Sequence, residues 1–222
     1  MAISYIGKVF ESASIADPRT HSVGLACKAG SLVCIAVAGK RSGAALALAG
    51  APTDSKGNEW HYATSPSSTA FAGVLYCRLT NPLATSDTIR IDWNGTPSHM
   101  WASAHNFEGA SGTPTDYGVS SGTATTWGTT VSVTGSDWLT FGTLILPNEY
   151  AVSGTPINSS IERDDNNATP VAPWCSCFSR NGTTGSTHTI GSSGVSVYYK
   201  VFGISFPFEA MQSGGRNNFA GF

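Results

Sequence analysis

The sequence predicts an all-β fold, built as a single antiparallel β-sandwich, and three observations lead to this prediction. Short apolar runs recur along the chain and are separated by clusters of Gly, Pro, Asn, Asp and Ser, as in sandwiches and barrels. Residues 88–93 alternate apolar and polar side chains, which is the period of a half-buried strand. No long segment has helical periodicity, so helices do not alternate with the strands and a parallel α/β sheet is excluded. Because spacing does not encode strand order, a jelly-roll and an immunoglobulin-like arrangement both stay open.

The predicted strands follow from these runs and from the turn residues that bound them. They cover residues 3–10, 22–28, 32–38, 44–49, 60–64, 70–79, 88–93, 99–107, 124–133, 138–146, 173–180, 187–190 and 195–206. Residues 44–51 are rich in Ala and Leu, and one or two turns of helix that end at Pro52 are an alternative there. The longest predicted loops are residues 51–59, 108–123, 147–160 and 163–172.

Length and composition are those of one globular domain. A chain of 222 residues with 41% hydrophobic residues can bury a sufficient core. Only 12% of the residues are charged, about half of the usual ~25%, so Ser, Thr, Asn and Gly supply the polar surface. The formal net charge is −2 without a basic stripe, which argues against nucleic-acid binding. The first residues lack the layout of a secretion signal and no apolar run could span a membrane, so we expect a soluble protein made in a cytoplasm.

Cysteine spacing predicts neither a disulfide framework nor a metal site. The five cysteines are an odd number, and Cys34 and Cys77 lie inside apolar runs, where a buried thiol is the usual state. Cys175 and Cys177 would share one face of a strand, which permits a redox or metal role. No second pair or neighbouring histidine in the sequence completes such a site. We therefore expect no cofactor and no metal.

Catalytic arrangements are also missing from the sequence pattern, and we predict that the chain is not an enzyme. No G-x-S-x-G nucleophile elbow occurs. His99 and His105 would share a strand face, without a third residue to complete a metal site. A glycosidase needs two carboxylates across a cleft, and the acidic candidates do not cluster: Glu59, Glu108, Glu149, Glu162 and Asp92. Residues 54–58 and 164–167 are predicted as turns, the second with oxygen atoms of the type that Ca²⁺ prefers.

Tryptophan content raises the alternative of carbohydrate binding, because sugars stack on exposed aromatic rings. The six tryptophans lie in or at the ends of predicted strands: Trp60, Trp93, Trp101, Trp127, Trp138 and Trp174. Such residues usually pack in the core or between sheets. A carbohydrate- or host-receptor-binding module is therefore the second prediction, which exposed, coplanar Trp or Tyr side chains in a groove would favour.

Four segments resemble small β-sandwich proteins that tailed bacteriophages, actinobacterial phages above all, encode among their virion genes. They are residues 1–9 (MAISYIGKV), 29–38 (AGSLVCIAVA), 56–60 (KGNEW) and 136–142 (SDWLTFG). Ser31 stands where an Asp is more usual in that pattern. The resemblance implies a non-enzymatic virion component that decorates the capsid or, alternatively, serves as a minor tail protein. It implies other virion proteins as partners and a location on the particle surface, and it transfers no catalytic residue.

The C-terminal residues 209–222 are predicted to form an arm on a sandwich of residues 1–208. The arm holds a Gly-Gly-Arg-Asn-Asn stretch and ends in Phe-Ala-Gly-Phe, a composition that frays unless a neighbour holds it. We expect it to contact another subunit or the capsid, through Phe208, Met211, Arg216, Phe219 and Phe222. The expected assembly is a homo-oligomer on a symmetry axis, and a surface glycan is a further candidate partner.

Overall fold

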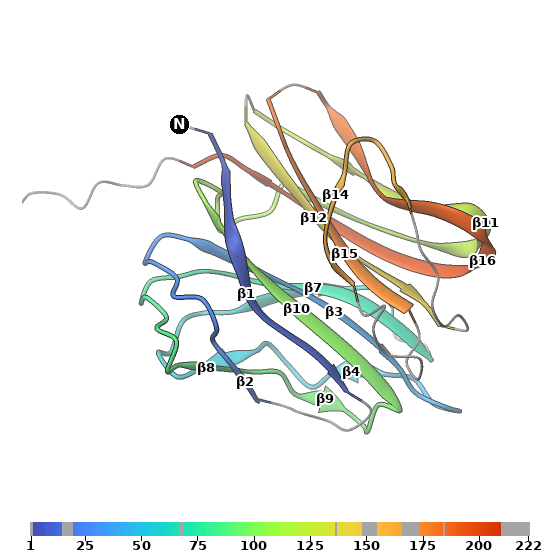
Figure 1. The fold of residues 1–222 in the computed structure, drawn as a ribbon, viewed down its shortest axis with the longest axis horizontal. Coiled ribbons are helices and arrows are strands. Elements are labelled where there is room, and N and C mark those ends of the chain that lie inside the picture. Colours follow the sequence, from blue (N-terminus) through green and yellow to red (C-terminus); the bar gives the residue numbers. More distant parts are fainter. Residues whose placement is uncertain are drawn as a thin grey trace, which may run out of the picture.

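The computed structural model describes residues 2–14, 20–66, 69–135, 137–147, 155–165, 174–183 and 185–209. These residues form strands, turns and loops and contain no helix, so none that is long and apolar enough to cross a membrane. The paired strands run antiparallel in every sheet. The all-β, sandwich-type fold predicted from the sequence is confirmed (Figure 1).

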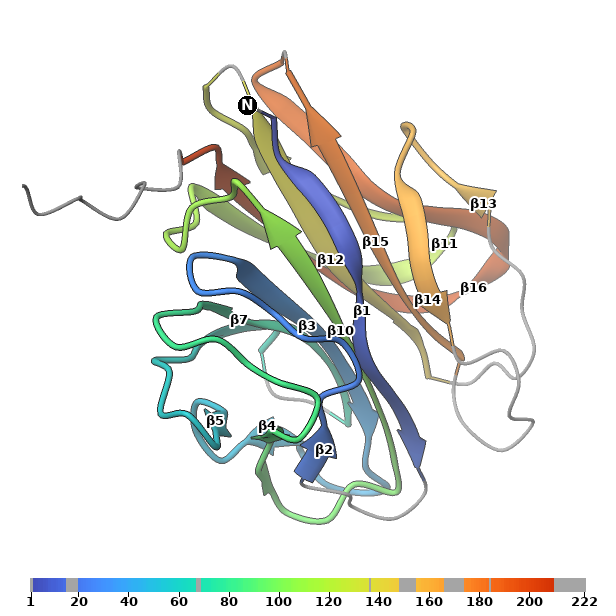
Figure 2. The same ribbon diagram turned by 60° about the vertical axis from the view of Figure 1, so that its left-hand side comes forward.

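Two large sheets face each other (Figure 1, Figure 2). The N-terminal sheet has the order β1 (Ser4–Ser14), β10 (His99–Glu108), β3 (Leu32–Lys40), β7 (Ala70–Arg78) and β6 (His61–Thr64). The C-terminal sheet has the order β11 (Asp116–Ser132), β16 (Thr187–Pro207), β12 (Trp138–Leu146), β15 (Trp174–Gly182) and β14 (Ile161–Asp165), and β13 (Thr155–Pro156) pairs with β16. Strand β12 packs on β3 and β7 of the other sheet, and β16 packs on β7.

The chain completes one large sheet before it starts the other. All strands of the N-terminal sheet come from residues 4–108, and all strands of the C-terminal sheet come from residues 116–207. In an immunoglobulin domain, strands A, B, E and D form one sheet and C, F and G the other, so the chain crosses between sheets several times. Here the chain crosses between the large sheets once, at the connection between β10 and β11.

Two small sheets cover the outer face of the N-terminal sheet. One contains β2 (Thr20–Ser22), β8 (Thr88–Arg90) and β5 (Thr53–Asp54), and the other pairs β4 (Ala47–Leu48) with β9 (Trp93–Asn94). Leu46 and Ile89 of this layer share a buried cluster with Val33 and Ile35 of β3. Because β3 is buried on both faces, its sequence is a continuous apolar run rather than an alternating one.

The core between the two large sheets is rich in aromatic side chains. Trp101 and Phe107 of β10 share a buried cluster with Phe141 of β12 and with Phe202 and Phe206 of β16. Phe107 and Phe141 meet edge to face, with ring centroids 5.9 Å apart. These rings hold the N-terminal sheet against the C-terminal sheet.

Strands β11 and β16 form a long ribbon, and its far half folds back over the outer face of the C-terminal sheet (Figure 2). The register runs from Asp116 opposite Ser205 to Ser132 opposite Thr187, with one irregularity near its middle. The last residue of β11 lies beside its first, and the Ser132 N–H donates to Asp116 Oδ2 over 2.7 Å. Ser205 Oγ also donates to the Ser132 carbonyl over 2.6 Å. The C-terminal sheet is thus covered on both faces, like the N-terminal one.

A row of three glycines lies beneath the folded half of this ribbon. Gly118 of β11 and Gly142 of β12 are each in register with Gly203 of β16, so the three lie side by side. A Cβ atom on Gly118 would lie 2.6 Å from the Thr130 carbonyl oxygen, and one on Gly203 would lie 2.9 Å from Ile190 Cγ2. Side chains in this row would hold the ribbon away from the sheet.

The predicted strands agree with the structure at the centre of both sheets. Residues 32–38, 70–79 and 138–146 correspond to β3, β7 and β12. Of residues 22–28, only Ser22 belongs to a strand, because the backbone of Cys27 pairs with Leu83 in an isolated bridge instead. Residues 44–51 contain the short strand β4 and no helix, so the strand alternative is the correct one there.

All four predicted loops and one predicted break contain strand residues, and the two-residue strands β5 and β13 lie inside the predicted loops 51–59 and 147–160. Strand β11 begins inside the predicted loop 108–123, and β14 extends into the predicted loop 163–172. Strand β16 continues through Gly191 and Gly194, where the sequence predicted a gap between two strands. A Cβ atom would lie 2.0 Å from the Trp127 carbonyl oxygen at Gly191 and 2.5 Å from the Trp127 ring at Gly194. Glycine at these positions lets the strand pass closely over Trp127 rather than end.

Candidate functional site

A buried group of polar side chains, here called the polar cluster, joins one edge of the N-terminal sheet to the C-terminal sheet. It comprises Tyr5 of β1, Ser103 and His105 of β10, Asp164 of β14 and Cys177 of β15. Ser103 Oγ lies 2.9 Å from His105 Nε2 and 2.7 Å from Asp164 Oδ2. Cys177 Sγ lies 3.2 Å from the same Nε2, and Tyr5 Oη lies 3.2 Å from His105 Nδ1. Serine, cysteine, histidine and aspartate at these distances make this the strongest candidate for an active site.

The carboxylate of Asp164 sets the directions of the hydrogen bonds that Ser103 and Tyr5 form in the polar cluster. The Asp164 carboxylate can only accept, so the Ser103 hydroxyl donates to it and offers a lone pair to the Nε2–H of His105. His105 Nδ1 then accepts from the Tyr5 hydroxyl, and the network sets this tautomer. In a nucleophilic serine the order is reversed, because the imidazole accepts the serine proton. Ser103 is therefore not activated as a nucleophile.

Burial makes His105 a poor base. The ring is fully buried, and lost hydration, aided by the positive charges of Arg163 and Lys8, lowers its pKa from 6.5 to about 3. Burial likewise raises the pKa of the Cys177 thiol well above its usual value. A neutral imidazole beside a protonated thiol does not provide the thiolate that a cysteine nucleophile needs.

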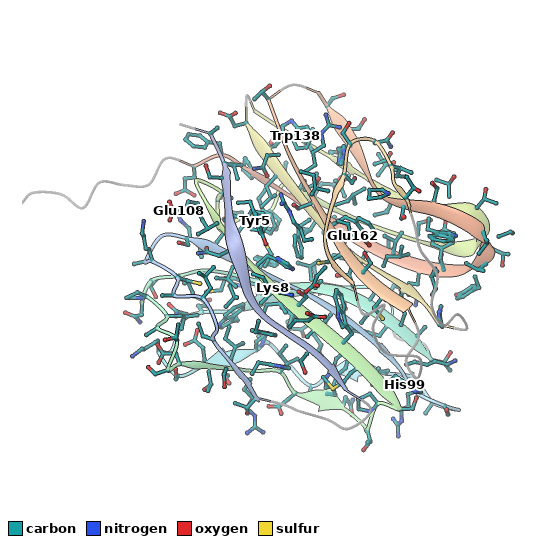
Figure 3. All side chains as sticks on the ribbon, viewed as in Figure 1. Tyr5, Lys8, His99, Glu108, Trp138 and Glu162 are labelled. Atoms are coloured by element: carbon teal, nitrogen blue, oxygen red, sulfur yellow. The ribbon has the colours of Figure 1, made fainter. Side chains whose placement is uncertain are left out.

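Charged side chains flank the polar cluster toward the surface. Lys8 Nζ lies 3.2 Å from Asp164 Oδ2 and 2.9 Å from Glu11 Oε2. The Arg163 guanidinium carbon lies 3.9 Å from the centre of the Tyr5 ring. Figure 3 shows Tyr5 and Lys8 along β1, the edge strand that these contacts connect to β14. The arrangement ties the two sheets together at this edge and is best described as structural.

Sequence reasoning missed the polar cluster because its members come from four strands. The one available signal was even spacing, which puts Ser103 and His105 on one face of a strand. The prediction that Asp164 lies in a solvated turn is wrong, because it belongs to β14 and turns toward Ser103 and Lys8. Residues 166–167 of that predicted turn lie outside the described residues.

The cysteines have neither disulfide bonds nor metal partners in the described part of the chain. All five are buried and form no disulfide bond, and the burial of Cys34 and Cys77 agrees with the prediction. No group of three His, Cys, Asp or Glu side chains among the described residues is arranged to hold a metal ion. His99 lies near the opposite end of β10 from His105 (Figure 3), so the two do not form one site.

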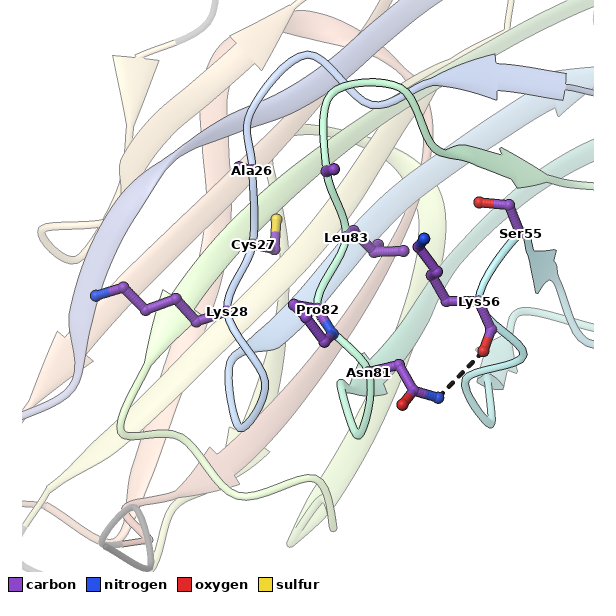
Figure 4. Close-up of a pocket in the computed structure, with 9 residues that line it drawn as sticks. Ala26, Cys27, Lys28, Ser55, Lys56, Asn81, Pro82 and Leu83 are labelled. Atoms are coloured by element: carbon purple, nitrogen blue, oxygen red, sulfur yellow. Dashed lines mark hydrogen bonds between the residues drawn. The ribbon is translucent and has the colours of Figure 1, made fainter. Parts of the chain in front are cut away.

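A surface groove of about 840 Å³ lies beside the outer layer of the N-terminal sheet (Figure 4). Three loop segments line it, residues 26–28, 55–56 and 81–84. Asn81 Nδ2 donates to the Lys56 carbonyl across the groove wall, over 3.1 Å. The volume falls in the range of small-molecule sites, about 300–1,000 Å³.

The reactive side chains of the groove are already engaged. Lys56 Nζ lies 3.4 Å from an Asp87 carboxylate oxygen, and Lys28 Nζ lies 3.4 Å from Glu108 Oε1. Burial raises the pKa of the Cys27 thiol to about 11, so the thiol is protonated at neutral pH. The groove therefore offers shape but no free nucleophile among these residues.

One wall of the groove is the turn formed by residues 54–58, and the turn predicted there is confirmed. Asp54 Oδ1 accepts from the backbone N–H groups of Lys56 and Asn58, over 2.8 and 3.2 Å. Asp54 Oδ2 accepts from the Trp60 indole over 2.7 Å. Gly57 has a φ of 71°, a conformation that glycine adopts without strain. One carboxylate thus organises the whole turn.

Asn58 connects this turn to the neighbouring loop. Its Oδ1 accepts from the backbone N–H groups of Thr80 and Asn81, over 3.0 and 2.8 Å. Its Nδ2 donates to the Asn81 carbonyl over 3.1 Å and to Asp54 Oδ2 over 3.0 Å. The KGNEW segment, one of those that resemble phage proteins, therefore has a structural role in this chain.

Replacing Asn58 with Ala is expected to lower the free energy of unfolding by about 2–4 kcal/mol. The change leaves backbone groups of a buried junction without partners, and each costs roughly 1–3 kcal/mol. The exposed neighbour Glu59→Ala is the matched control, with an expected change within about 0.5 kcal/mol. Urea unfolding followed by tryptophan fluorescence measures both. Equal midpoints for the two variants would show that Asn58 does not hold this junction.

The tryptophans whose side chains the structure describes do not form an exposed platform for a sugar. Five are buried, namely Trp60, Trp93, Trp101, Trp127 and Trp138, and the Trp174 side chain is not among those described. The large exposed aromatic side chains of the described residues are tyrosines, Tyr62, Tyr117 and Tyr198.

The acidic residues considered for a glycosidase lie on separate elements. Glu108 pairs with Lys28, Asp92 pairs with Arg90, and Glu162 accepts from Ser176. Glu59 is exposed, and Glu149 lies outside the described residues.

Of the predicted assembly residues, the structure describes Phe208. This side chain is half-buried against the core between the sheets, and its backbone N–H donates to the Asp137 carbonyl over 2.9 Å. Its backbone also forms an isolated bridge with Ala110. The structure therefore brings Phe208 onto the sandwich itself. Met211, Arg216, Phe219 and Phe222 lie outside the described residues.

A comparison of the chain with protein-family models, with curated proteins and with solved structures finds no match. The resemblance to phage virion proteins therefore stays a prediction.

Proposed function

We propose that the chain is a non-enzymatic structural protein of a bacteriophage particle, which decorates the capsid surface and contacts neighbouring subunits. The observation that supports this best is a contrast between interior and surface. Three side chains of the polar cluster with nucleophile or base chemistry, Ser103, His105 and Cys177, are fully buried. Strand β11, at one end of the C-terminal sheet, presents mostly uncharged polar side chains, which suit contacts with other proteins. The phage setting rests on the sequence resemblance.

The construction of the sandwich also suits a protein used in many copies on a particle. Three separate buried clusters stabilise the one chain, because both faces of each large sheet are covered. Buried apolar area is the main source of stability in a domain. A low charged fraction of 12% limits repulsion between closely spaced copies.

The alternative is a minor tail protein or a carbohydrate- or receptor-binding module on the tail. Five tryptophans are buried, and a groove beside β11 has a single exposed aromatic side chain, Tyr117, rather than a platform of several coplanar rings. We therefore place decoration first.

Immunogold electron microscopy tests the proposal. An antibody against the chain would be applied to purified particles of the phage whose genome carries the sequence. We expect label over the surface of the head. Label confined to the tail tip would favour the alternative, and particles without label would contradict both.

A further inference from the structure

Strand β11 is the least protected of the four outer strands of the sandwich. Strand β1 has two irregularities in its register and carries Lys8 and Glu11, and β6 has only four residues. Strand β14 has a bulge and the charged run Glu-Arg-Asp-Asp. Bulges, charges and shortness are the usual means by which edge strands avoid pairing with other chains. Strand β11 has 17 residues and a single charged one, Asp116 at its start.

The unprotected edge is also apolar at its start. Tyr117 is 66% exposed and Val119 is 46% exposed, although both point to the same side as the buried Phe202. Ser121 and Thr123 continue the same exposed face of β11. Among the described residues, no strand pairs with the outer edge of β11. The backbone groups on this edge can therefore accept an additional strand.

A groove of about 370 Å³ lies directly beside this edge. Tyr117, Val119 and Phe202 line it from the C-terminal sheet, and Pro66 and Phe71 line it from the N-terminal sheet. All of its lining residues are uncharged. An exposed edge next to an apolar groove is the arrangement by which proteins bind an extended segment, with the backbone paired and a side chain in the groove.

The chain itself supplies a segment of matching chemistry. Residues 210–222 lie beyond the described part and contain Met211, Phe219 and Phe222, with Arg216 as the one charged residue. Thirteen residues reach up to about 43 Å when extended, which exceeds the roughly 30 Å spanned by residues 116–124, the first half of β11. Arg216 meets no like charge on β11, where the charged residue is Asp116.

Contacts at the end of β16 favour the arm of another copy over the chain's own arm. Glu209 forms an ion pair with Arg78 at the end of β7. The segment from Ser111 to Thr115 lies along the end of β16, where it donates to the carbonyls of Pro207 and Ser205. A chain's own arm would have to cross this segment to reach the outer edge of β11.

We propose that the outer edge of β11, with the groove beside it, receives the C-terminal arm (residues 210–222) of a second copy of the chain. This inference rests on the proposed function as an assembly protein and names the contact by which copies join.

Two full-length variants separate the donor of this contact from its acceptor. Phe219→Ser/Phe222→Ser removes the anchors of the arm, and Tyr117→Ser/Val119→Ser removes the apolar part of the edge. We expect the wild type to associate with rising concentration in sedimentation velocity, and each variant to remain a 23.0 kDa monomer. An equimolar mixture of the two variants should form a 1:1 species of twice that mass, because each supplies the part that the other lacks. Tyr62→Ser, an exposed change on β6, is the control and should associate like the wild type.

Three results would overturn the inference. They are a wild type that is monomeric at every concentration, an arm variant that associates like the wild type, and a mixture that stays monomeric. Circular dichroism of each variant verifies that it is folded. Incorporation into phage particles is measured separately, so a protein that is present in particles but monomeric in solution would refute this contact and leave the proposed function intact.

Discussion

Lowering the pH from 7 to 4.5 is expected to reduce the free energy of unfolding by about 2.5 kcal/mol through His105 alone. The folded-state pKa is about 3, below the 6.5 of an ordinary histidine, so the unfolded chain binds the proton more readily in this window. Stability is therefore full above about pH 6.5 and falls as the pH drops toward 3. An imidazolium has two N–H donors, so His105 could no longer accept from Tyr5. Asp164 acts in the opposite direction, because burial raises its pKa and acid then relieves the cost of its buried charge.

Urea unfolding at a series of pH values measures this effect. In His105→Gln, the loss of stability per pH unit between pH 6 and 4 should shrink by about 1.2 kcal/mol, whatever the stability at pH 7. Proton NMR of the histidine ring provides a direct check in the wild type, where the His105 signal should not titrate between pH 8 and 5. A His105 midpoint near 6.5 would contradict the sealed polar cluster.

Replacing Gly191 with Ala is expected to lower the free energy of unfolding by about 3–5 kcal/mol. The new Cβ would lie 2.0 Å from the Trp127 carbonyl oxygen and 2.7 Å from Gly128 Cα, so β11 and β16 would have to separate. Gly191 also has a φ of 152°, which residues with a side chain rarely adopt. Overpacking and backbone strain each cost roughly 1–3 kcal/mol.

Gly50→Ala is the matched control for this change, because nothing lies within 4 Å of a Cβ atom at that position. Thermal unfolding should show a Tm close to that of the wild type for Gly50→Ala and a Tm lower by many degrees for Gly191→Ala. Similar melting temperatures for the two variants would mean that the ribbon does not pass over Trp127 as closely as described.

The sequence predicts well the strands and turns that are determined by residues close together in the chain. Continuous apolar runs such as residues 32–38 correctly indicate central strands, and Asp54 with Gly57 correctly indicates a turn. The same local logic fails at Gly191 and Gly194, where glycine reflects a close approach between distant strands rather than a break. Contacts between residues far apart in sequence decide such positions, and spacing alone does not encode them.

The candidate site shows the same limit. The five members of the polar cluster lie on four strands from both halves of the chain, so no motif announces them. The acidic and amide residues that follow Asp164 predict a turn. The structure places Asp164 in a strand instead, where its carboxylate accepts from Ser103. The first half of β11 was not predicted as a strand for a similar reason, because its Gly- and Ser-rich sequence is typical of a loop.

Quantitative mass spectrometry of purified phage particles tests the central proposal most directly. The measurement gives the copies of this chain in each particle relative to the major capsid protein. A decoration protein should be present in hundreds of copies per particle, in a fixed ratio to the capsid protein. Absence of the chain from purified particles would contradict the proposal that it is a virion protein.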